Sequence, residues 1–238
     1  VSKLMSPDST FRIFTWELKK DESYFRQKGA IQMRTKDGSL KLFPLLDMSD
    51  YAENPVDSVR SNLNWIGAIY YNIIMNEYKG KKYYTLFGFD DNNFMSTRKW
   101  LEVLTFDDDG KPVFGGKFFD YKDDVLKYPQ PAYRFLMEFK KDAGTRLNYD
   151  PQTKLILFDH LISESNEPQK KFTLVPDGDF EAFKWANGKW VHIDTAFNDK
   201  IQQGDEPRPK PLFDESGNFN EDLLMEQSEK NREKKPEP

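Results

Sequence analysis

The chain has 238 residues, of which 37% are hydrophobic and 32% charged, and its formal net charge of −5 excludes the broad basic surface of a nucleic-acid-binding protein. It contains no cysteine and no stretch approaching the roughly 18 consecutive apolar residues of a membrane-spanning helix, so disulfides, cysteine-ligated metals and a transmembrane segment are not expected. Aromatic residues make up 15% of the chain, which favours a β-rich core.

Short apolar and aromatic runs recur along the first 198 residues, and glycine, proline, aspartate or asparagine bounds them. In chain order this pattern predicts strands at 11–18, 30–35, 40–46, 65–75, 83–89, 100–106, 113–119, 133–139, 146–149, 155–162, 180–185 and 190–193. Residues 47–64 lack such a pattern and are predicted to form a loop, with one helical turn after Asn54-Pro55.

Three dipeptides between these runs are hairpin signals: Asp37-Gly38, Asp109-Gly110 and Asn187-Gly188. Tight hairpin turns need positive φ, which glycine and asparagine tolerate. Strands joined by short turns must be antiparallel neighbours. We therefore predict an all-β fold, a predominantly antiparallel meander of about a dozen strands, too many for one flat sheet. A curled sheet and a barrel-like, sandwich or propeller-like arrangement all satisfy this pattern.

The composition changes after residue 198. Residues 199–238 carry 11 acidic and 7 basic side chains and five of the 14 prolines. Such a segment buries too little apolar surface to offset its ordering entropy, so we predict a β-rich domain at 1–198 and a flexible, largely disordered tail at 199–238. Helix signals at 218–235 suggest a short docking helix, with Phe219, Leu223 and Leu224 as partner-binding residues.

Few side chains suggest catalysis. The only histidines are His160 and His192, and Asp159 and His160, adjacent on one strand, should point to opposite faces. The sequence has no Gly-x-Ser-x-Gly elbow, no HExxH motif and no glycine-rich phosphate loop. Acidic clusters at 90–93, 107–109 and 177–181 contain oxygen ligands for calcium, but turn chemistry explains them equally well. We therefore assign no catalytic residue, metal or cofactor and favour a non-enzymatic protein.

Large aromatic side chains suggest binding instead. Adjacent pairs such as Tyr70-Tyr71 place one ring on each face of a strand, so some rings lie outside the core or in a second interface. We predict that Trp65, Tyr71 and Tyr84 contact a protein partner, since tryptophan and tyrosine dominate binding energy. The alternative is a carbohydrate-binding or carbohydrate-processing module that uses these aromatics with Asp90, Asp159 or Asp177.

Several segments together suggest a family. They are SPD at 6–8, FRIFTW at 11–16, WIGAIYY at 65–71, YYTLFGFD at 83–90, VLTFDDDGKPVFG at 103–115, LNYD at 147–150, FDHL at 158–161 and VPDG at 175–178. In this order they resemble a group of uncharacterised exported proteins of Bacteroidetes-type Gram-negative bacteria. The resemblance covers residues 5–195 and implies a location in the cell envelope, in the periplasm or associated with the outer membrane. The expected role is that of an accessory subunit with protein partners, and peripheral membrane association is compatible with it.

Overall fold

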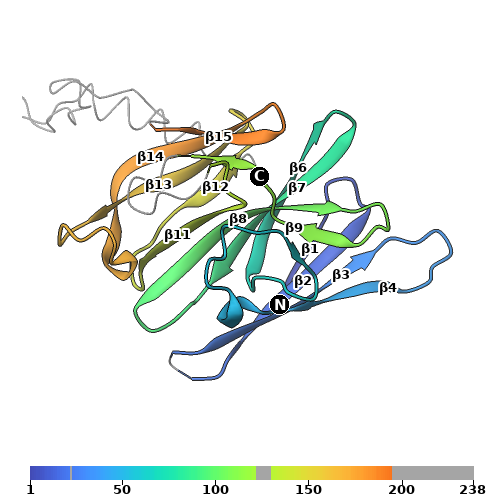
Figure 1. The fold of residues 1–238 in the computed structure, drawn as a ribbon, viewed down its shortest axis with the longest axis horizontal. Helices are drawn as coiled ribbons and strands as arrows, with labels where there is room; N and C mark the ends of the chain where they lie inside the picture. The colour runs from blue at the N-terminus through green and yellow to red at the C-terminus, as the bar shows by residue number, and fades with distance from the viewer. Residues whose placement is uncertain (22, 122–129, 195–238) are drawn as a thin grey trace, which may run out of the picture. The chain divides into compact units, whose positions relative to one another are not determined.

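A computed structural model describes residues 1–21, 23–121 and 130–194. The fold is all-β with mainly antiparallel sheets, as predicted. Two short 3-10 helices, η1 (Ser49–Tyr51) and η2 (Lys171–Thr173), are the only helical elements in the described ranges. The strands form three separate sheets of four, six and five strands, so within these ranges no sheet closes into a barrel (Figure 1).

The N-terminal sheet is a meander of four antiparallel strands in sequence order. Its strands are β1 (Ser2–Met5), β2 (Phe11–Lys19), β3 (Phe25–Met33) and β4 (Lys41–Leu46). Side chains alternate along β2, where Phe11, Ile13 and Thr15 are buried and Arg12 is exposed. One face of this sheet therefore packs on the core while the other meets solvent.

The central sheet is organised around one long strand. It consists of β5 (Arg60–Ser61), β6 (Ile69–Tyr78), β7 (Lys81–Asp90), β8 (Ser96–Phe106), β9 (Pro112–Phe114) and β11 (Arg134–Lys140). Strand β8 pairs with β7 along one edge, and along the other it pairs first with β11 and then, from Leu104 onward, with β9. The pairing with β11 departs from a simple meander.

The C-terminal sheet has the order β10-β15-β14-β13-β12. Its strands are β10 (Phe119–Asp120), β12 (Leu147–Asp150), β13 (Leu155–Ser163), β14 (Leu174–Ala186) and β15 (Lys189–Ile193). Strand β10 runs parallel to β15, with Phe119 opposite Trp190, whereas the other strand pairs in the described residues are antiparallel. This pairing joins segments that lie far apart in the sequence.

Two hydrophobic cores lie on opposite sides of the central sheet. One packs Phe11, Ile13 and Ile31 of the N-terminal sheet against Leu86, and the other packs Phe87 against the C-terminal sheet. Figure 1 shows the central strands between the blue N-terminal sheet and the yellow and orange C-terminal one. Because both faces are covered, β7 is buried continuously over residues 84–88 instead of in alternation.

The predicted positive φ angles at the three turn glycines are confirmed, but the connection that contains Gly38 spans residues 34–40 and is longer than a tight hairpin turn. Gly38, Gly110 and Gly188 have φ angles of 77°, 70° and 80°, and each lies between antiparallel strands. At the β14–β15 turn, Asn187 also has a positive φ, 51°, so both central residues adopt the conformation that a two-residue hairpin requires.

Several details of the sequence prediction are wrong. The strands predicted at 30–35 and 180–185 extend from Phe25 to Met33 and from Leu174 to Ala186. The strand predicted at 113–119 is two strands, because Gly115 and Gly116, with φ angles of 81° and 148°, interrupt it. The fourth predicted strand begins at Ile69 and not at Trp65. The helical turn lies before Asn54, at η1, and not after it. Strand β1 was not predicted, because its four residues are too few for a recognisable pattern.

Candidate functional site

Both histidines lie in one cluster on β13, β14 and β15, together with three carboxylates. His160 Nδ1 donates to Asp177 Oδ2 at 2.8 Å, and His160 Nε2 lies 3.8 Å from Glu181 Oε1. The other oxygen of Glu181 accepts a hydrogen bond from His192 Nε2. His192 Nδ1 lies 3.1 Å from Asp194 Oδ1. Glu181 thus joins the two imidazoles into a chain that alternates carboxylates and histidines, which we call the histidine cluster.

An irregularity in the β13–β14 ladder places His160 in this cluster. The register shifts at His160, where residues 177–179 of β14 form an excursion. Gly178, in the middle of the excursion, has a φ of 99°, a conformation that glycine adopts without strain. Such bulges redirect side chains, and here Asp177 is brought onto the imidazole.

The cluster borders a hollow of about 200 Å³ with an aromatic wall that includes Phe135 and Phe158. The His192 ring stacks on Phe158, with centroids 5.9 Å apart and planes 25° apart. Only 12% of the His192 side chain is exposed. His192 lies directly opposite the buried Phe183 in the β14–β15 pairing, so the two rings project to the same side of the sheet and contact each other.

The electrostatics of the cluster favour an ionised Asp177. Partial burial by itself would raise the pKa of this carboxyl. The hydrogen bonds from His160 and from the backbone N–H of Asp179 outweigh burial, and the pKa is lowered. The carboxylate therefore holds the His160 ring in a fixed orientation through Nδ1.

An oriented imidazole can act as a general acid or base, or it can assist a nucleophile or a bound metal. The carboxylate that orients His160 is Asp177 and not Asp159. Asp159 Oδ2 accepts a hydrogen bond from the Arg146 backbone N–H at 2.7 Å. Ser163 Oγ accepts from the backbone N–H of Glu167 at 2.9 Å and lies 3.3 Å from Ser165 Oγ. Among the described residues, no group of three or more histidines and acids is arranged to hold a metal ion.

Asp90, the third carboxylate of the carbohydrate alternative, lies away from the histidine cluster, at the end of β7 beside the N-terminal sheet. The Gln27 side-chain amide donates to both Asp90 Oδ1 and Glu17 Oε2 at 2.8 Å. Burial raises the pKa of Asp90 to about 6, and the neighbouring carboxylates Glu17 and Asp47 act in the same direction. We call this group the Asp90 cluster.

A second buried carboxylate, Glu102 on β8, forms an ion pair with Arg134. Arg134 Nε on β11 donates to Glu102 Oε2 at 2.8 Å, and both side chains are almost completely buried. The remaining guanidinium nitrogens donate to the backbone oxygens of Pro55, Ser58 and Phe114. Because it ties the 55–58 loop to two strands, this ion pair has a structural role.

The structure places the predicted partner-binding aromatics in the interior. Trp65 is fully buried, and its Nε1 donates to Tyr70 Oη at 2.7 Å. Tyr84 is 4% exposed and donates to Asp8. Tyr71 is partly buried, and its hydroxyl donates to the Leu147 backbone oxygen at 2.7 Å. Trp65 and Tyr84 therefore offer no ring face to a partner, because both faces of the central sheet are covered.

The other three predicted partner-binding residues, Phe219, Leu223 and Leu224, lie outside the described residues, as does the whole tail at 199–238. In the adjacent pairs Tyr70-Tyr71 and Tyr83-Tyr84, the two rings lie on opposite faces of the central sheet. Tyr70 and Tyr84 belong to one hydrophobic core, and Tyr71 and Tyr83 pack on the other.

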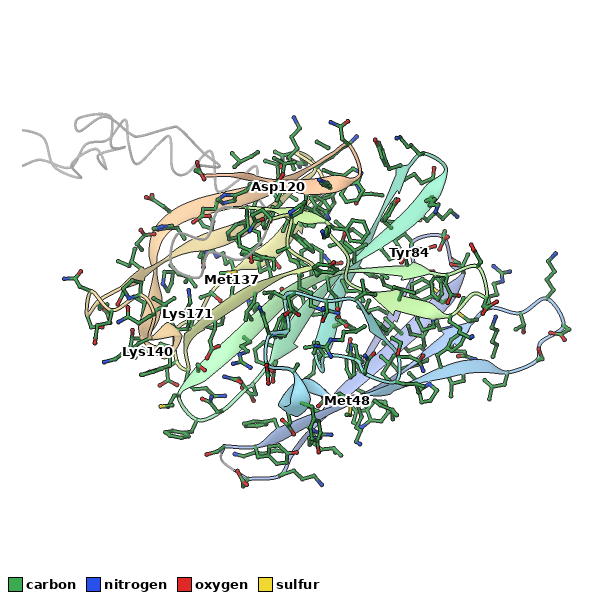
Figure 2. All side chains as sticks on the ribbon, in the orientation of Figure 1. Met48, Tyr84, Asp120, Met137, Lys140 and Lys171 are labelled. Atoms are coloured by element: carbon green, nitrogen blue, oxygen red, sulfur yellow. The ribbon has the colours of Figure 1, made fainter. Side chains whose placement is uncertain are left out.

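The sequence analysis did not predict a hollow of about 490 Å³ that lies between residues 94–95, 140–142, 164–165 and 172–173. Phe94 and Met95, in the β7–β8 turn, are 62% and 41% exposed, and Phe172 in η2 is 38% exposed. Lys140 and Lys141 also line it, and Figure 2 marks this region by Lys140 and Lys171. We call it the turn hollow. Apolar residues within predicted turns were the signal that could have revealed it.

Comparisons with protein-family models, curated proteins and solved structures found no match for this chain. In the part of the chain that the structure describes, no helix is long and apolar enough to cross a membrane.

Proposed function

We propose that the chain is a non-enzymatic accessory domain of the bacterial cell envelope that binds a protein partner through the turn hollow. The exposure of Phe94 beside Met95 and Phe172 carries this proposal. Aromatic side chains that become buried at an interface contribute most of the binding energy, and grouped apolar side chains on a surface mark interaction sites. The envelope location is supported by the family resemblance.

Charged side chains of both signs border the turn hollow: Lys140, Lys141, Asp142 and Glu164. Lys141 Nζ donates to the side chain of Asp91 at 2.6 Å, so its charge is partly compensated, while Lys140 is exposed. An apolar centre with a polar rim is the usual anatomy of a protein interface. We infer that the partner inserts an apolar side chain between Phe94 and Phe172.

Capture from envelope extracts tests the proposal. The full chain is immobilised, a captured protein is identified and purified, and its affinity is measured for wild type and for Phe94→Ser/Phe172→Ser. We expect a loss of at least about tenfold, since hot-spot truncations cost more than about 1.4 kcal/mol. Val59→Ser, which alters an exposed apolar residue outside the turn hollow, is the matched control and should bind as wild type. Equal affinity of the double variant and wild type would refute this site.

The non-enzymatic assignment has its own test. Asp159→Asn with His160→Ala retains an acceptor for the Arg146 N–H but removes the oriented imidazole. We expect this variant to capture the partner normally. Hydrolysis of a polysaccharide by the wild-type protein that disappears in the variant would contradict the proposal and favour the carbohydrate alternative. That alternative remains a prediction, with Asp159 lining the hollow beside His160 and Asp90 outside it.

A further inference from the structure

The solvent-facing side of the N-terminal sheet has an unusual composition. Strand register defines this side, because residues directly paired across strands project to the same face. Three cross-strand rows make up most of it: Met5, Arg12, Gln32 and Leu42; then Lys3, Phe14, Ala30 and Pro44; then Trp16, Lys28 and Leu46. The paired residues Leu18 and Arg26 extend it. We call these residues the outer face.

The outer face carries cations and no carboxylate. Glu17 is the single acidic residue in the four strands, and it points to the inner side, where Gln27 donates to it. Lys3, Arg12 and Lys28 are exposed, and none of them has an ion-pair partner within the described ranges. Arg26, the fourth cation, is paired with Asp50 at 2.6 Å. Three positive charges without an ion-pair partner among the described residues therefore project from one side of the sheet.

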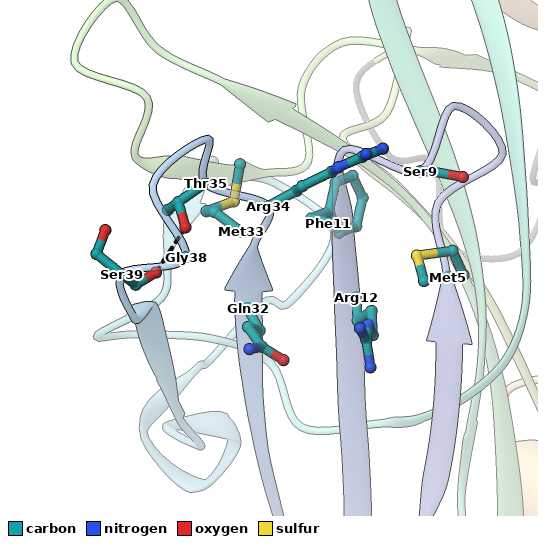
Figure 3. A pocket seen from close by; sticks show the side chains of 10 residues that line it. All are labelled: Met5, Ser9, Phe11, Arg12, Gln32, Met33, Arg34, Thr35, Gly38 and Ser39. Atoms are coloured by element: carbon teal, nitrogen blue, oxygen red, sulfur yellow. Dashed lines mark hydrogen bonds between the residues drawn. The ribbon is translucent and has the colours of Figure 1, made fainter.

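Apolar side chains lie between these charges. Met5, Leu42 and Leu46 are 47%, 46% and 47% exposed, and Phe14 and Trp16 are partly buried between them. Figure 3 shows Met5, Arg12 and Gln32 on three neighbouring strands, at the edge of a hollow of about 320 Å³ that Arg34 also lines. The outer face thus combines aliphatic area with separated positive charges.

The exposed aliphatic side chains and the unpaired cations of the outer face limit the kinds of molecule that could bind there. A second copy of the chain would place the same unpaired cations against one another across a two-fold interface, which is unfavourable. A single-stranded nucleic acid requires a series of exposed aromatic rings for base stacking, whereas the aromatic rings here lie on β2 alone and the exposed apolar residues are aliphatic. A bilayer with anionic lipids offers distributed negative charge above an apolar layer.

We propose that the outer face of β1–β4 docks on an anionic lipid surface. Lys3, Arg12 and Lys28 lie against the lipid phosphates, and Met5, Leu42 and Leu46 enter the interfacial region between them. Each cation near an anionic bilayer strengthens binding by a factor of about five, and each buried methylene adds a smaller factor. Docking is therefore reversible, dependent on salt, and independent of the protein-binding turn hollow.

Vesicle co-sedimentation of the full chain tests this. One set of vesicles contains roughly equal parts of phosphatidylglycerol and phosphatidylcholine, and the other contains phosphatidylcholine alone. We expect binding to the anionic set only, and release when salt is raised to about 0.3 M. Arg12→Gln/Lys28→Gln should bind the anionic vesicles about 30-fold more weakly, because two cations are removed. Lys154→Gln/Lys184→Gln, with the same charge change at exposed positions outside β1–β4, is the matched control and should bind as wild type.

Several outcomes would overturn the proposal. These are equal binding of wild type to both vesicle sets, no binding to either set, and undiminished binding by a folded Arg12→Gln/Lys28→Gln variant. Binding to an oligothymidylate but not to vesicles would identify a nucleic-acid surface instead. Should that variant not fold, Leu42→Ser/Leu46→Ser replaces it, and it should also weaken binding because its apolar contacts are lost. A failure here leaves the turn hollow unaffected, since the two surfaces share no residue.

Discussion

Glu102 and Asp90 are both buried carboxylates on neighbouring strands of the central sheet, and their cationic partners differ. Glu102 faces Arg134 directly across the β8–β11 pairing. Asp90 faces Arg98 across the β7–β8 pairing, but Arg98 donates to Glu138 at 2.9 Å instead. Asp90 is left with the Gln27 amide and the Asn92 backbone N–H as donors.

The difference shows how one sheet handles a buried charge in two ways. At Glu102 the charge is retained and compensated by an ion pair and hydrogen bonds. At Asp90 burial outweighs the stabilising effects of the Asn92 N–H and of the Arg98 charge, and the pKa of the carboxyl rises to about 6. Removing the cation from the first site and the charge from the second should therefore have opposite effects on stability.

The largest effect is expected for Arg134→Met. This change leaves Glu102 buried without its cation and leaves the backbone oxygens of the 55–58 loop without donors. Breaking a buried pair in this way costs about 3–5 kcal/mol of unfolding free energy. Urea denaturation at pH 7 measures it. Adding Glu102→Gln, which removes the buried charge, should recover part of the loss; no recovery would show that the pairing itself contributes little.

Asp90→Asn should act in the opposite direction. Because the folded pKa of about 6 exceeds the unfolded value of about 3.9, the native state of the wild type loses stability as pH rises between these values. Asparagine keeps an acceptor for Gln27 and Asn92 but removes the charge. At pH 7 we expect a gain of about 2 kcal/mol, which should shrink as pH falls toward 4. Urea midpoints at several pH values measure it, and a gain that does not depend on pH would contradict the assignment.

The smallest effect is expected for Glu17→Gln, which tests coupling within the Asp90 cluster. Burial raises the pKa of Glu17 and the hydrogen bond from Gln27 opposes this, so the net effect of removing its charge is well below that for Asp90. Its removal should also lower the pKa of Asp90, since Glu17 is one cause of that increase. Titration of Asp90 by carboxyl NMR in the variant measures this. An unchanged pKa of Asp90 would show that the charge of Glu17 does not contribute to it.

Local features of the fold could be predicted from sequence. The all-β class, the positions of most strands and the three glycine turns follow from two-residue alternation and from the backbone freedom of glycine. These signals depend on residues within a few positions of one another. The basic residues of the outer face are also visible in the sequence, as Arg12 on β2 and the alternating pair Arg26 and Lys28 on β3.

Tertiary structure decided which of these residues are buried. Trp65 and Tyr84 carry the same sequence pattern as exposed binding aromatics, but a second layer covers each face of the central sheet. The Glu102–Arg134 pair joins residues 32 positions apart, and the histidine cluster depends on a shift of register between β13 and β14. Sequence patterns report the periodicity of a strand and not which element packs against it, because packing is set by contacts between distant parts of the chain.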